Sequence, residues 1–347
     1  MRVLEIAPPY GAIGPELVYS PIVDVAARHA SELQQHGHEI VLSALEGSVV
    51  PGVEIIESPA DRPDVFHAQL GTVLPRVMRG EFDVIQVHNA ETLLGLLGAG
   101  ATDTGAQLVA TLHGQGDRVG PRYSGLIDPA KGVHALAISS SQAESLRRYF
   151  DVAGVVFNGV DTETYKPADP VTKGDFAFIL SRITDDKGIT RSIHAARSAE
   201  MRLIIAGVVL PQDEGYFIDQ VVPLLAGGVV DYIGPLTDRE KLPYLQQARA
   251  VLQLSKFEEV GSLTALEAMS CGTPVVASAR GCFPEMIVEG VSGFASDDIE
   301  LCSQGLRLAY GLDTEQVRGV TIARYSWRNT GIMLAAVLEK IVRPDYV

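Results

Sequence analysis

Short apolar runs alternate with longer amphipathic stretches along the first half of the sequence. The short runs have the length and composition of buried strands, and the longer stretches repeat their apolar residues with the period of a helix. Gly37 ends the first long stretch, where glycine readily adopts the left-handed backbone of a helix C-terminus. The pattern predicts parallel strands at residues 3–7, 39–44, 53–57, 84–88, 107–113, 136–139 and 155–158, with helices at 18–36 and 142–150.

The alternation pauses at residues 158–161 and again at 166–170, where two prolines three residues apart favour a linker. A second series follows, with no internal repeat of 20–50 residues. It predicts strands at 176–181, 202–207, 230–233, 251–254 and 274–278, and helices at 238–248, 263–270 and 326–342. We expect two doubly wound α/β domains that face each other across a cleft, where the carboxyl ends of the strands meet a ligand.

Length and composition agree with this division. A chain of 347 residues with 46% apolar residues suits two domains with a core each, and excludes a disordered scaffold. Its 28 basic and 43 acidic residues give a net charge of −15. A surface that binds nucleic acid normally carries a basic excess, so we expect no nucleic-acid partner.

Cysteine usage and the absence of long apolar runs indicate a cytoplasmic protein. Cys271, Cys282 and Cys302 are odd in number and lack metal-ligand spacing, so we expect reduced, mostly buried thiols. Glu5 stands where a signal peptide would need an apolar run. No uncharged stretch reaches the roughly 18 residues of a membrane-spanning helix, so integral membrane association is not expected.

Three loops carry residues suited to binding an anionic ligand. The first, residues 7–16, contains Gly11 and Gly14 directly after the first predicted strand. Glycines at a strand-to-helix turn let backbone amides approach an anion, although the same turn can require glycine for backbone reasons alone. The spacing is G-x-x-G, so the G-x-G-x-x-G fingerprint of nicotinamide binding is missing and a dehydrogenase is disfavoured.

The second loop follows the first strand of the second series and contains Arg182, Lys187 and Gly188. A guanidinium and an ammonium at the carboxyl end of a strand could hold a diphosphate. The alternative is a solvated loop in which Lys187 pairs with Asp185 or Asp186.

The third segment, residues 257–277, gives the strongest signal. Ser262 can cap a helix whose N-terminal amides bind a phosphate or a sugar hydroxyl. Glu259 and Glu267, eight residues apart, can both face the cleft, and carboxylates accept paired hydrogen bonds from the diol of a ribose or hexose. The alternative, that Glu267 is an exposed helix residue, is weakened by its apolar neighbours Leu266 and Met269.

Together these motifs resemble the retaining GT-B glycosyltransferases of family 4. Residues 259–277 match the family pattern E-x-x-G-L-x-x-x-E-A-M-A-x-G-x-P-V-V-A almost throughout. Arg182 with Lys187 and Gly188 looks like its R…K-G diphosphate clamp, and Gly14 looks like its N-terminal glycine. The N-G-V-D at 158–161, the T-L-H-G at 111–114 and the Y-S-W at 325–327 are similar to further family motifs. The likeness covers essentially the whole chain in the expected order.

The resemblance implies a GT-B fold of two Rossmann-like domains. Residues 1–168, with a returning helix at 327–347, would bind the acceptor, and residues 169–326 would bind a nucleotide sugar of UDP or GDP type. It implies that Arg182 and Lys187 neutralise the leaving diphosphate and that Glu267 holds the ribose. Glu259 would hold the transferred sugar and His113 would reach it from the first domain. The other donor-binding residues implied are Gly14, Gly234, Pro235, Leu236, Gly261, Ser262 and Leu263.

The resemblance further implies that neither a metal nor another cofactor is needed, in line with the absence of a D-x-D motif. The clamp would then stabilise the charge that develops on the diphosphate. The family usually has glycine where Ser262 stands and Phe or Cys where Gly261 stands, which leaves the donor sugar open. No carboxylate in the motifs is clearly placed as a nucleophile, so our hypothesis is a front-face transfer with retention, in which a diphosphate oxygen helps deprotonate the acceptor hydroxyl.

The acceptor is predicted from charge. Residues 1–170 hold 11 Lys/Arg and 21 Asp/Glu, whereas residues 171–347 hold 17 and 22. A strongly acidic acceptor domain disfavours an anionic membrane lipid and favours a soluble small molecule or saccharide. His88 and Asn89, at the end of a predicted strand, could contact it or could be structural polar residues. A GT-B nucleotide-sugar epimerase and a non-catalytic nucleotide-sugar binding protein remain alternatives, and the oligomeric state stays open.

Overall fold

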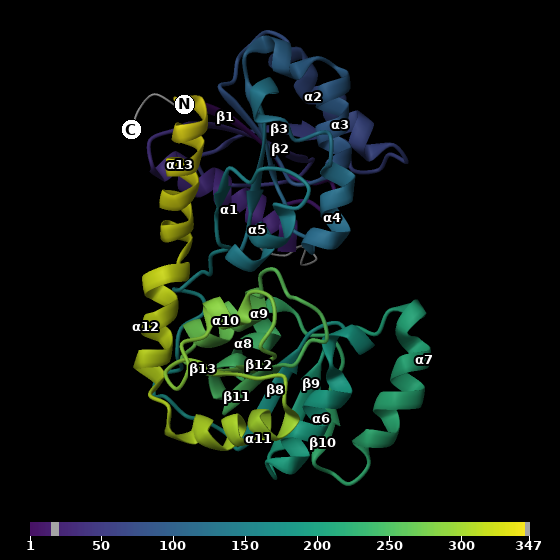
Figure 1. Cartoon of the computed structure of the whole chain (residues 1–347), viewed down its shortest axis with the longest axis vertical. Coiled ribbons are helices and arrows are strands. Elements are labelled where there is room, and N and C mark those ends of the chain that lie inside the picture. Colours follow the sequence, from purple (N-terminus) through teal and green to yellow (C-terminus); the bar gives the residue numbers. More distant parts are fainter. Residues whose placement is uncertain (15–20, 344–347) are drawn as a thin grey trace. The chain divides into compact units, whose positions relative to one another are not determined.

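The computed structural model describes residues 1–14 and 21–343 and divides the chain into two compact units (Figure 1). The first unit comprises Met1–Gly159 and Trp327–Val347, and the second comprises Val160–Ser326. Each unit contains one fully parallel sheet. The α/β class and the doubly wound arrangement predicted from the sequence are therefore confirmed.

The sheet of the first unit has the strand order β3-β2-β1-β4-β5-β6-β7. All seven predicted strands are present, with boundaries shifted by a few residues. They are β1 (Arg2–Ile6), β2 (Glu39–Leu45), β3 (Glu54–Ser58), β4 (Val84–Val87), β5 (Gln107–Thr111), β6 (Val133–Ala137) and β7 (Gly154–Val155).

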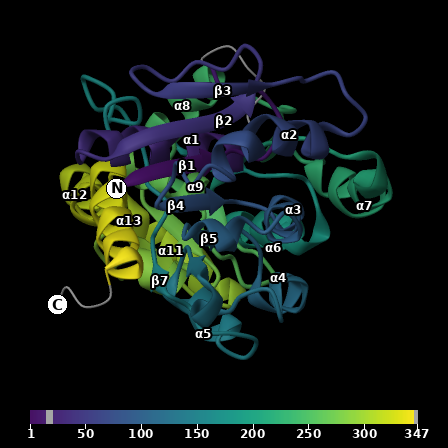
Figure 2. The same ribbon diagram turned by 90° about the horizontal axis from the view of Figure 1, so that it is seen from above.

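Helices cover both faces of this sheet. One face packs against α2 (Val65–Val77), α3 (Ala90–Gly98) and α4 (Gly116–Tyr123). The other packs against α1 (Pro21–Gln35) and α13 (Trp327–Val342), the chain's last helix, which lies beside α1 (Figure 2). α5 (Ser140–Leu146) completes the unit. Gly37, just after α1, has φ +84°, as predicted, while residues 18–20 of the predicted first helix lie outside the described residues.

The sheet of the second unit has the order β10-β9-β8-β11-β12-β13. Its strands are β8 (Phe176–Leu180), β9 (Arg202–Ala206), β10 (Val230–Tyr232), β11 (Ala250–Gln253), β12 (Val275–Ala277) and β13 (Gly293–Ala295). The last strand was not predicted, because G-F-A is too short to show any apolar period and gains its order only by pairing with β12.

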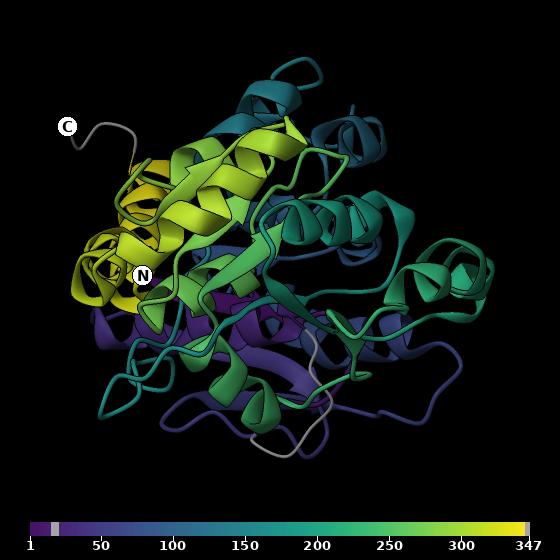
Figure 3. The same ribbon diagram turned by 90° about the horizontal axis from the view of Figure 1, so that it is seen from below.

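Helices again lie on both sides of the sheet (Figure 3). α6 (Ile189–Ser198) and α11 (Ile299–Leu308) share one core with the strands. Tyr244 of α8 (Asp238–Gln247) stacks on Phe178 of β8 from the opposite face. The remaining helices are α7 (Glu214–Tyr216), α9 (Leu263–Ser270), α10 (Phe283–Met286) and α12 (Thr314–Tyr325).

The chain crosses into the second unit earlier than the predicted boundary at 168/169. Residues 160–165 already bond to the second unit: the Val160 amide donates to the Tyr325 carbonyl at 2.8 Å, and Arg318 donates to the carbonyls of Thr162 and Tyr165. These contacts attach residues 160–165 to α12, whereas residues 166–175, where the prolines predicted a linker, form neither helix nor strand. The return crossing at Ser326/Trp327 falls where the sequence placed it.

The strand order reverses once in each sheet, between β1 and β4 and between β8 and β11. Such a switch point separates the two neighbouring loops at the carboxyl edge and leaves room for a ligand. The loops that follow these four strands carry most of the residues selected from the sequence.

The described residues contain no helix that is both long and apolar enough to span a membrane. All three cysteines are free and buried, as predicted.

Candidate functional site

The loop after β8 is held against the end of β11 by a glycine. Gly188, which separates a 3₁₀ turn at Asp185–Lys187 from α6, has φ +66°. A Cβ built there would lie 1.9 Å from the Leu254 carbonyl oxygen. Only glycine permits both the left-handed backbone and this approach, so Gly188 brings the two loops of the switch point together.

Lys187 uses this proximity to bond with the next loop. Its Nζ lies 2.6 Å from Glu259 Oε1 and 4.9 Å from the centre of the Phe257 ring. Ser255 Oγ donates to the same Glu259 oxygen at 2.8 Å. The alternative in which Lys187 pairs with Asp185 or Asp186 is wrong, because Gly188 turns the chain toward β11.

Asp185 pairs with Lys256 instead, whose Nζ lies 2.5 Å from Asp185 Oδ1. Arg182 lies in the same loop with an exposed side chain, and no hydrogen bond or ion pair joins its guanidinium to another described residue. The switch point of the second unit therefore holds one available guanidinium beside a lysine that is already paired.

The start of α9 agrees with the sequence prediction. Ser262 has an extended backbone, and its Oγ accepts a hydrogen bond from the Ala265 amide at 3.3 Å. The cap satisfies one of the free amides of the first turn, at the helix end where the dipole favours an anion. Gly261 precedes the cap, and Leu263 is the first helical residue.

Glu267 lies one turn into α9 and is 6% exposed, so the alternative of an exposed helix residue is wrong. Its Oε1 lies 2.9 Å from Nζ of Lys241, a residue of α8 whose side chain is 5% exposed. Lys241 also contacts Asp238 Oδ1 at 2.7 Å and lies 5.2 Å from the centre of the Tyr165 ring. Burial raises the pKa of Glu267, and Lys241 opposes the rise.

Sequence reasoning missed Lys241. A lysine in the first turns of an amphipathic helix is normally exposed, and the helix pattern here gives it no distinguishing signal. Lys241 reaches Glu267 because α8 packs beside α9, and no local sequence pattern predicts that contact.

The predicted base-pocket residues lie in the loop from β10 to α8. Gly234 has φ +80°, and its carbonyl accepts from the Gly207 amide at 2.9 Å. Pro235 is exposed and Leu236 is half-buried. The loop ends at a complete capping box between Thr237 and Glu240, which fixes the start of α8.

In the first unit, the glycine loop after β1 is only partly within the described residues. Gly14 is half-buried, and the Ile13 amide beside it donates to Ser48 Oγ at 3.0 Å. Residues 15 and 16, which complete the predicted loop, lie outside the described residues.

His113 follows β5 and bonds to a second histidine. Its Nε2 lies 2.7 Å from Nδ1 of His88, whose other ring nitrogen, Nε2, bonds to Oε1 of Glu5. The side chains of His88 and Glu5 are both fully buried. Burial lowers the pKa of His88 to about 3 and lowers that of His113, and it raises the pKa of Glu5.

The predicted acceptor contacts divide accordingly. Both nitrogens of His88 are bonded inside the unit, so this side chain offers nothing to an acceptor and the suggestion is wrong for it. Asn89 is the N-cap of α3, with Oδ1 accepting from the Thr92 amide at 2.7 Å. Its buried Nδ2 has no partner among the described residues. Asn89 therefore has a structural role and one unused donor.

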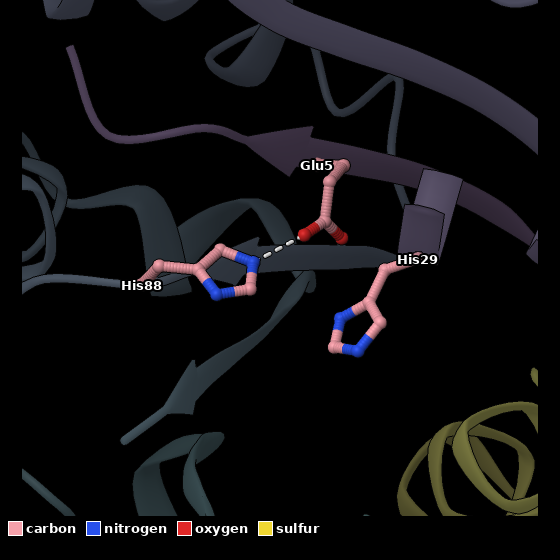
Figure 4. Close-up of side chains that lie close together, drawn as sticks. All are labelled: Glu5, His29 and His88. Atoms are coloured by element: carbon pink, nitrogen blue, oxygen red, sulfur yellow. Dashed lines mark hydrogen bonds and ion pairs between the residues drawn. The ribbon is translucent and has the colours of Figure 1, made fainter. Parts of the chain in front are cut away.

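Glu5, His29 and His88 form a buried cluster that the sequence analysis did not identify (Figure 4). One potential ligand atom from each lies within 4.8 Å of the others. A signal was present, since Glu5 is the one charge between Val3 and Ala7 in a strand buried on both faces. A charge at such a position needs a partner and marks a polar site inside a sheet.

Comparison with known proteins gives two family matches. A sequence profile described as "Glycosyl transferases group 1" matches residues 161–306, and one described as "Glycosyltransferase Family 4" matches residues 22–164. D-inositol 3-phosphate glycosyltransferase of Frankia alni is 35% identical over 164 residues, which are 41% of this chain and 40% of that protein. The chain spans about half the length of the curated relatives it matches.

Several solved structures match nearly the whole chain. A glycosyltransferase involved in avilamycin A biosynthesis has a TM-score of 0.73 at 20% identity and covers 98% of both chains. The Anabaena protein Alr3699/HepE in complex with UDP and glucose has a TM-score of 0.72 at 17% identity, covering 98% of this chain and 100% of that one. At such identities the likeness shows the fold.

Proposed function

The chain belongs to the group 1 glycosyltransferases of family 4 and has the GT-B fold, and we propose that it transfers a sugar from a nucleoside diphosphate to a hydroxyl group of an acceptor. One observation carries the proposal. At the switch point of the second unit, Arg182, the Lys187–Glu259 pair and the capped start of α9 lie on the two loops that Gly188 holds together.

Arg182 and Lys187 are the diphosphate ligands in this proposal. The Arg182 guanidinium is available to two phosphate oxygens at once. Lys187 lies beside Glu259 with its side chain 18% exposed, and a diphosphate would add a second anionic partner to it. A charge-assisted hydrogen bond contributes about 1.5–3 kcal/mol, so each cation changes the donor affinity by roughly 10- to 100-fold.

The sugar and the ribose contact the two buried glutamates. Glu259 accepts from transferred-sugar hydroxyls beside the Gly261, Ser262 and Leu263 amides, and Glu267 accepts from the ribose diol. The lysine beside each carboxylate holds it in one orientation before the donor arrives, which lowers the ordering cost of binding. His113 and Gly14 of the first unit are further proposed ligands of the donor. The loop at Gly234, Pro235 and Leu236 contacts the base.

The transfer itself is proposed to be retaining and independent of metal. The bond from the sugar C1 to the diphosphate oxygen breaks while a bond from C1 to the acceptor oxygen forms on the same face. The acceptor proton passes to the departing diphosphate oxygen, and Arg182 and Lys187 stabilise the charge that develops there. A sugar–enzyme adduct on Glu259 would contradict this step.

The donor is proposed to be a UDP- or GDP-sugar, and the acceptor a soluble small molecule or saccharide in the cytoplasm. A UDP donor is supported by the fold neighbour described in complex with UDP and glucose. The acceptor class is supported by the acidity of residues 1–170.

The test is a binding screen by thermal shift and calorimetry against UDP, GDP, ADP and dTDP, with and without Mg²⁺. Ligand binding stabilises the native state by mass action, so a true donor nucleotide raises the melting temperature. We expect one diphosphate to bind without metal and Arg182→Gln to weaken it by about 10- to 100-fold. Arg202→Gln is the matched control, because Arg202 is an exposed arginine at the amino end of β9 in the same sheet.

Three outcomes separate this function from its alternatives. No binding by any diphosphate to a folded protein contradicts the donor site. Conversion of the nucleotide sugar to an isomer without an acceptor indicates an epimerase. A non-catalytic binding protein would bind the donor tightly but would neither hydrolyse it slowly in the absence of an acceptor nor transfer its sugar to any hydroxyl compound in an acceptor library.

A further inference from the structure

A chain of polar side chains crosses the inside of the first unit beneath α1 and α13. Glu5 of β1, Gln86 of β4 and Thr111 of β5 alternate with apolar residues that pack against these two helices. Gln86 pairs with Glu5 in register, and His88 and His113 continue this face past the ends of β4 and β5. The network runs from the buried strand β1 to the half-buried His113 at the carboxyl edge.

Glu5 has one partner in this network. Its Oε1 bonds to His88, and its Oε2 is buried with no partner among the described residues (Figure 4). Among the described residues, no lysine or arginine side chain forms an ion pair with Glu5. An ionised carboxylate without a cation in such a place is very costly, and a protonated carboxyl is far less so.

Among the described residues, the titratable groups that join Glu5 in this network are three histidines: His29 of α1, His88 after β4, and His113 after β5, which reaches Glu5 through His88. β2 places Leu42 beside it in register. Burial lowers the pKa of all three histidines, so the rings are neutral at neutral pH. Burial raises the pKa of Glu5 well above its ordinary range, which favours a network without net charge.

The position of each proton then follows from the hydrogen bonds. A neutral Glu5 donates its O–H to His88 Nε2, so His88 carries its own proton on Nδ1 and donates it to His113 Nε2. His113 is left with its proton on Nδ1. An ionised Glu5 would reverse every bond and leave His113 Nδ1 as an acceptor.

We propose that Glu5 is a positioning residue of the donor site: through His88 it fixes the tautomer of His113, so that His113 presents an N–H donor to the bound sugar nucleotide. The proposal rests on the donor role of His113 in the proposed function. The hydroxyl and phosphate oxygens of the donor ligand can all accept a hydrogen bond from an N–H group. A ring nitrogen without a proton could bond to the hydroxyl groups but not to the phosphate oxygens.

A metal ion between Glu5, His29 and His88 is the competing explanation of the cluster. Ligands of a tetrahedral zinc with bonds of about 2.0–2.1 Å lie roughly 3.3 Å apart. The Glu5 oxygen and the His88 nitrogen are instead in direct hydrogen-bond contact, and Gln86 Nε2 donates to His29 Nδ1 at 3.2 Å. The geometry is that of a hydrogen-bonded chain.

The decisive variants are Glu5→Gln and Glu5→Leu. The glutamine amide donates to His88 Nε2 as a protonated carboxyl does, so Glu5→Gln should preserve the tautomers. Glu5→Leu fits the space without a donor and should let His88 and His113 exchange between tautomers. His134→Gln is the control. His134 is a mostly buried histidine of β6 in the same sheet, and it bonds to Gln107 and not to the Glu5–His88–His113 network.

The first readout is ¹⁵N NMR of the imidazoles in the ligand-free protein with labelled histidine. The sequence has eight histidines, and signals lost in His88→Gln and His113→Gln assign the two rings. We expect both rings as Nδ1–H tautomers in the wild type and in Glu5→Gln, and a mixture for His113 in Glu5→Leu. An Nε2–H tautomer of His113 in the wild type, or a reversal in Glu5→Gln, overturns the proposal.

The second readout separates positioning from stability. With a donor found in the binding screen, Glu5→Leu should lower kcat by about tenfold at an unchanged KM, and Glu5→Gln should restore it. Equal activity of Glu5→Leu and the wild type overturns the proposal even when the tautomers shift. Stoichiometric zinc in the purified protein, measured by mass spectrometry and lost in Glu5→Gln, replaces it with the metal site. If no donor binds, the NMR result still decides the tautomer link while the proposed function fails on its own test.

Discussion

Replacing Lys241 with methionine tests whether Glu267 depends on a buried cation. Lys241 Nζ lies 2.9 Å from Glu267 Oε1, and the two side chains are 5% and 8% exposed. Methionine keeps most of the aliphatic stem of the lysine and removes the charge. The carboxylate of Glu267 then remains buried without an ammonium group, because Asp238, the other partner of Lys241, is itself an anion.

The size of the effect is limited by proton uptake. At an effective dielectric constant of 20, charges 2.9 Å apart attract by about 6 kcal/mol. Glu267 avoids losing all of this by becoming protonated, and protonation at pH 7 of a group with an ordinary pKa of 4.5 costs only about 3.4 kcal/mol. We therefore expect Lys241→Met to lower the free energy of unfolding by about 3 kcal/mol at pH 7.

The sign of the pH dependence follows from the raised pKa of Glu267. Without Lys241 this pKa rises further, so the folded protein holds a proton that the unfolded chain releases above about pH 4.5. The free energy of unfolding falls with rising pH by about 1.4 kcal/mol per unit until the folded pKa is reached. The difference from the wild type should be small at pH 5 and near its full size at pH 7.

The assay is urea denaturation at pH 5, 6, 7 and 8, followed by circular dichroism and by fluorescence. The only tryptophan, Trp327, belongs to the first unit, so its fluorescence separates changes in that unit from changes in the second. Lys241→Met combined with Glu267→Gln should recover most of the stability and lose the pH dependence. A penalty that is equal at all four pH values, or a double variant no more stable than Lys241→Met, would refute the reasoning.

Substitutions at three further positions have outcomes that follow from local geometry. Gly188→Ala should lower the free energy of unfolding by about 2 kcal/mol more than Gly125→Ala. Both glycines have positive φ, but only a Cβ at position 188 would clash with a carbonyl, that of Leu254. Equal urea midpoints for the two variants would contradict this. Ser262→Ala should cost about 1 kcal/mol through the lost helix cap and Ser262→Gly only a few tenths, and the reverse order in a urea titration would exclude the cap. Burial lowers the pKa of Lys173 to about 8, so the unfolded chain binds its proton more tightly; between pH 8 and 10.5 the wild type should gain stability relative to Lys173→Met, and parallel pH curves would show that the amine is solvated.

The course of the chain and the ends of its elements could be predicted because they depend on local chemistry. The apolar runs became strands wherever they were long enough to show a period, and Gly37 and Ser262 ended and began helices through their own backbone and side-chain preferences. The motif residues Arg182 and Lys187 could be located for the same reason, since a loop directly after a parallel strand lies at the carboxyl edge of its sheet.

Partnership between side chains was decided by tertiary structure alone. Lys187 pairs with Glu259 and not with its sequence neighbours because Gly188 brings the loop after β8 against the end of β11. Lys241 pairs with Glu267 because α8 packs beside α9. Glu5 stood out in its strand from the start, yet its link to His113 needed the β1–β4–β5 order that puts the strands side by side. Local propensity acts over a few residues, whereas a buried charge is stabilised by whichever group the fold brings within about 3 Å, and no short stretch of sequence contains that distance.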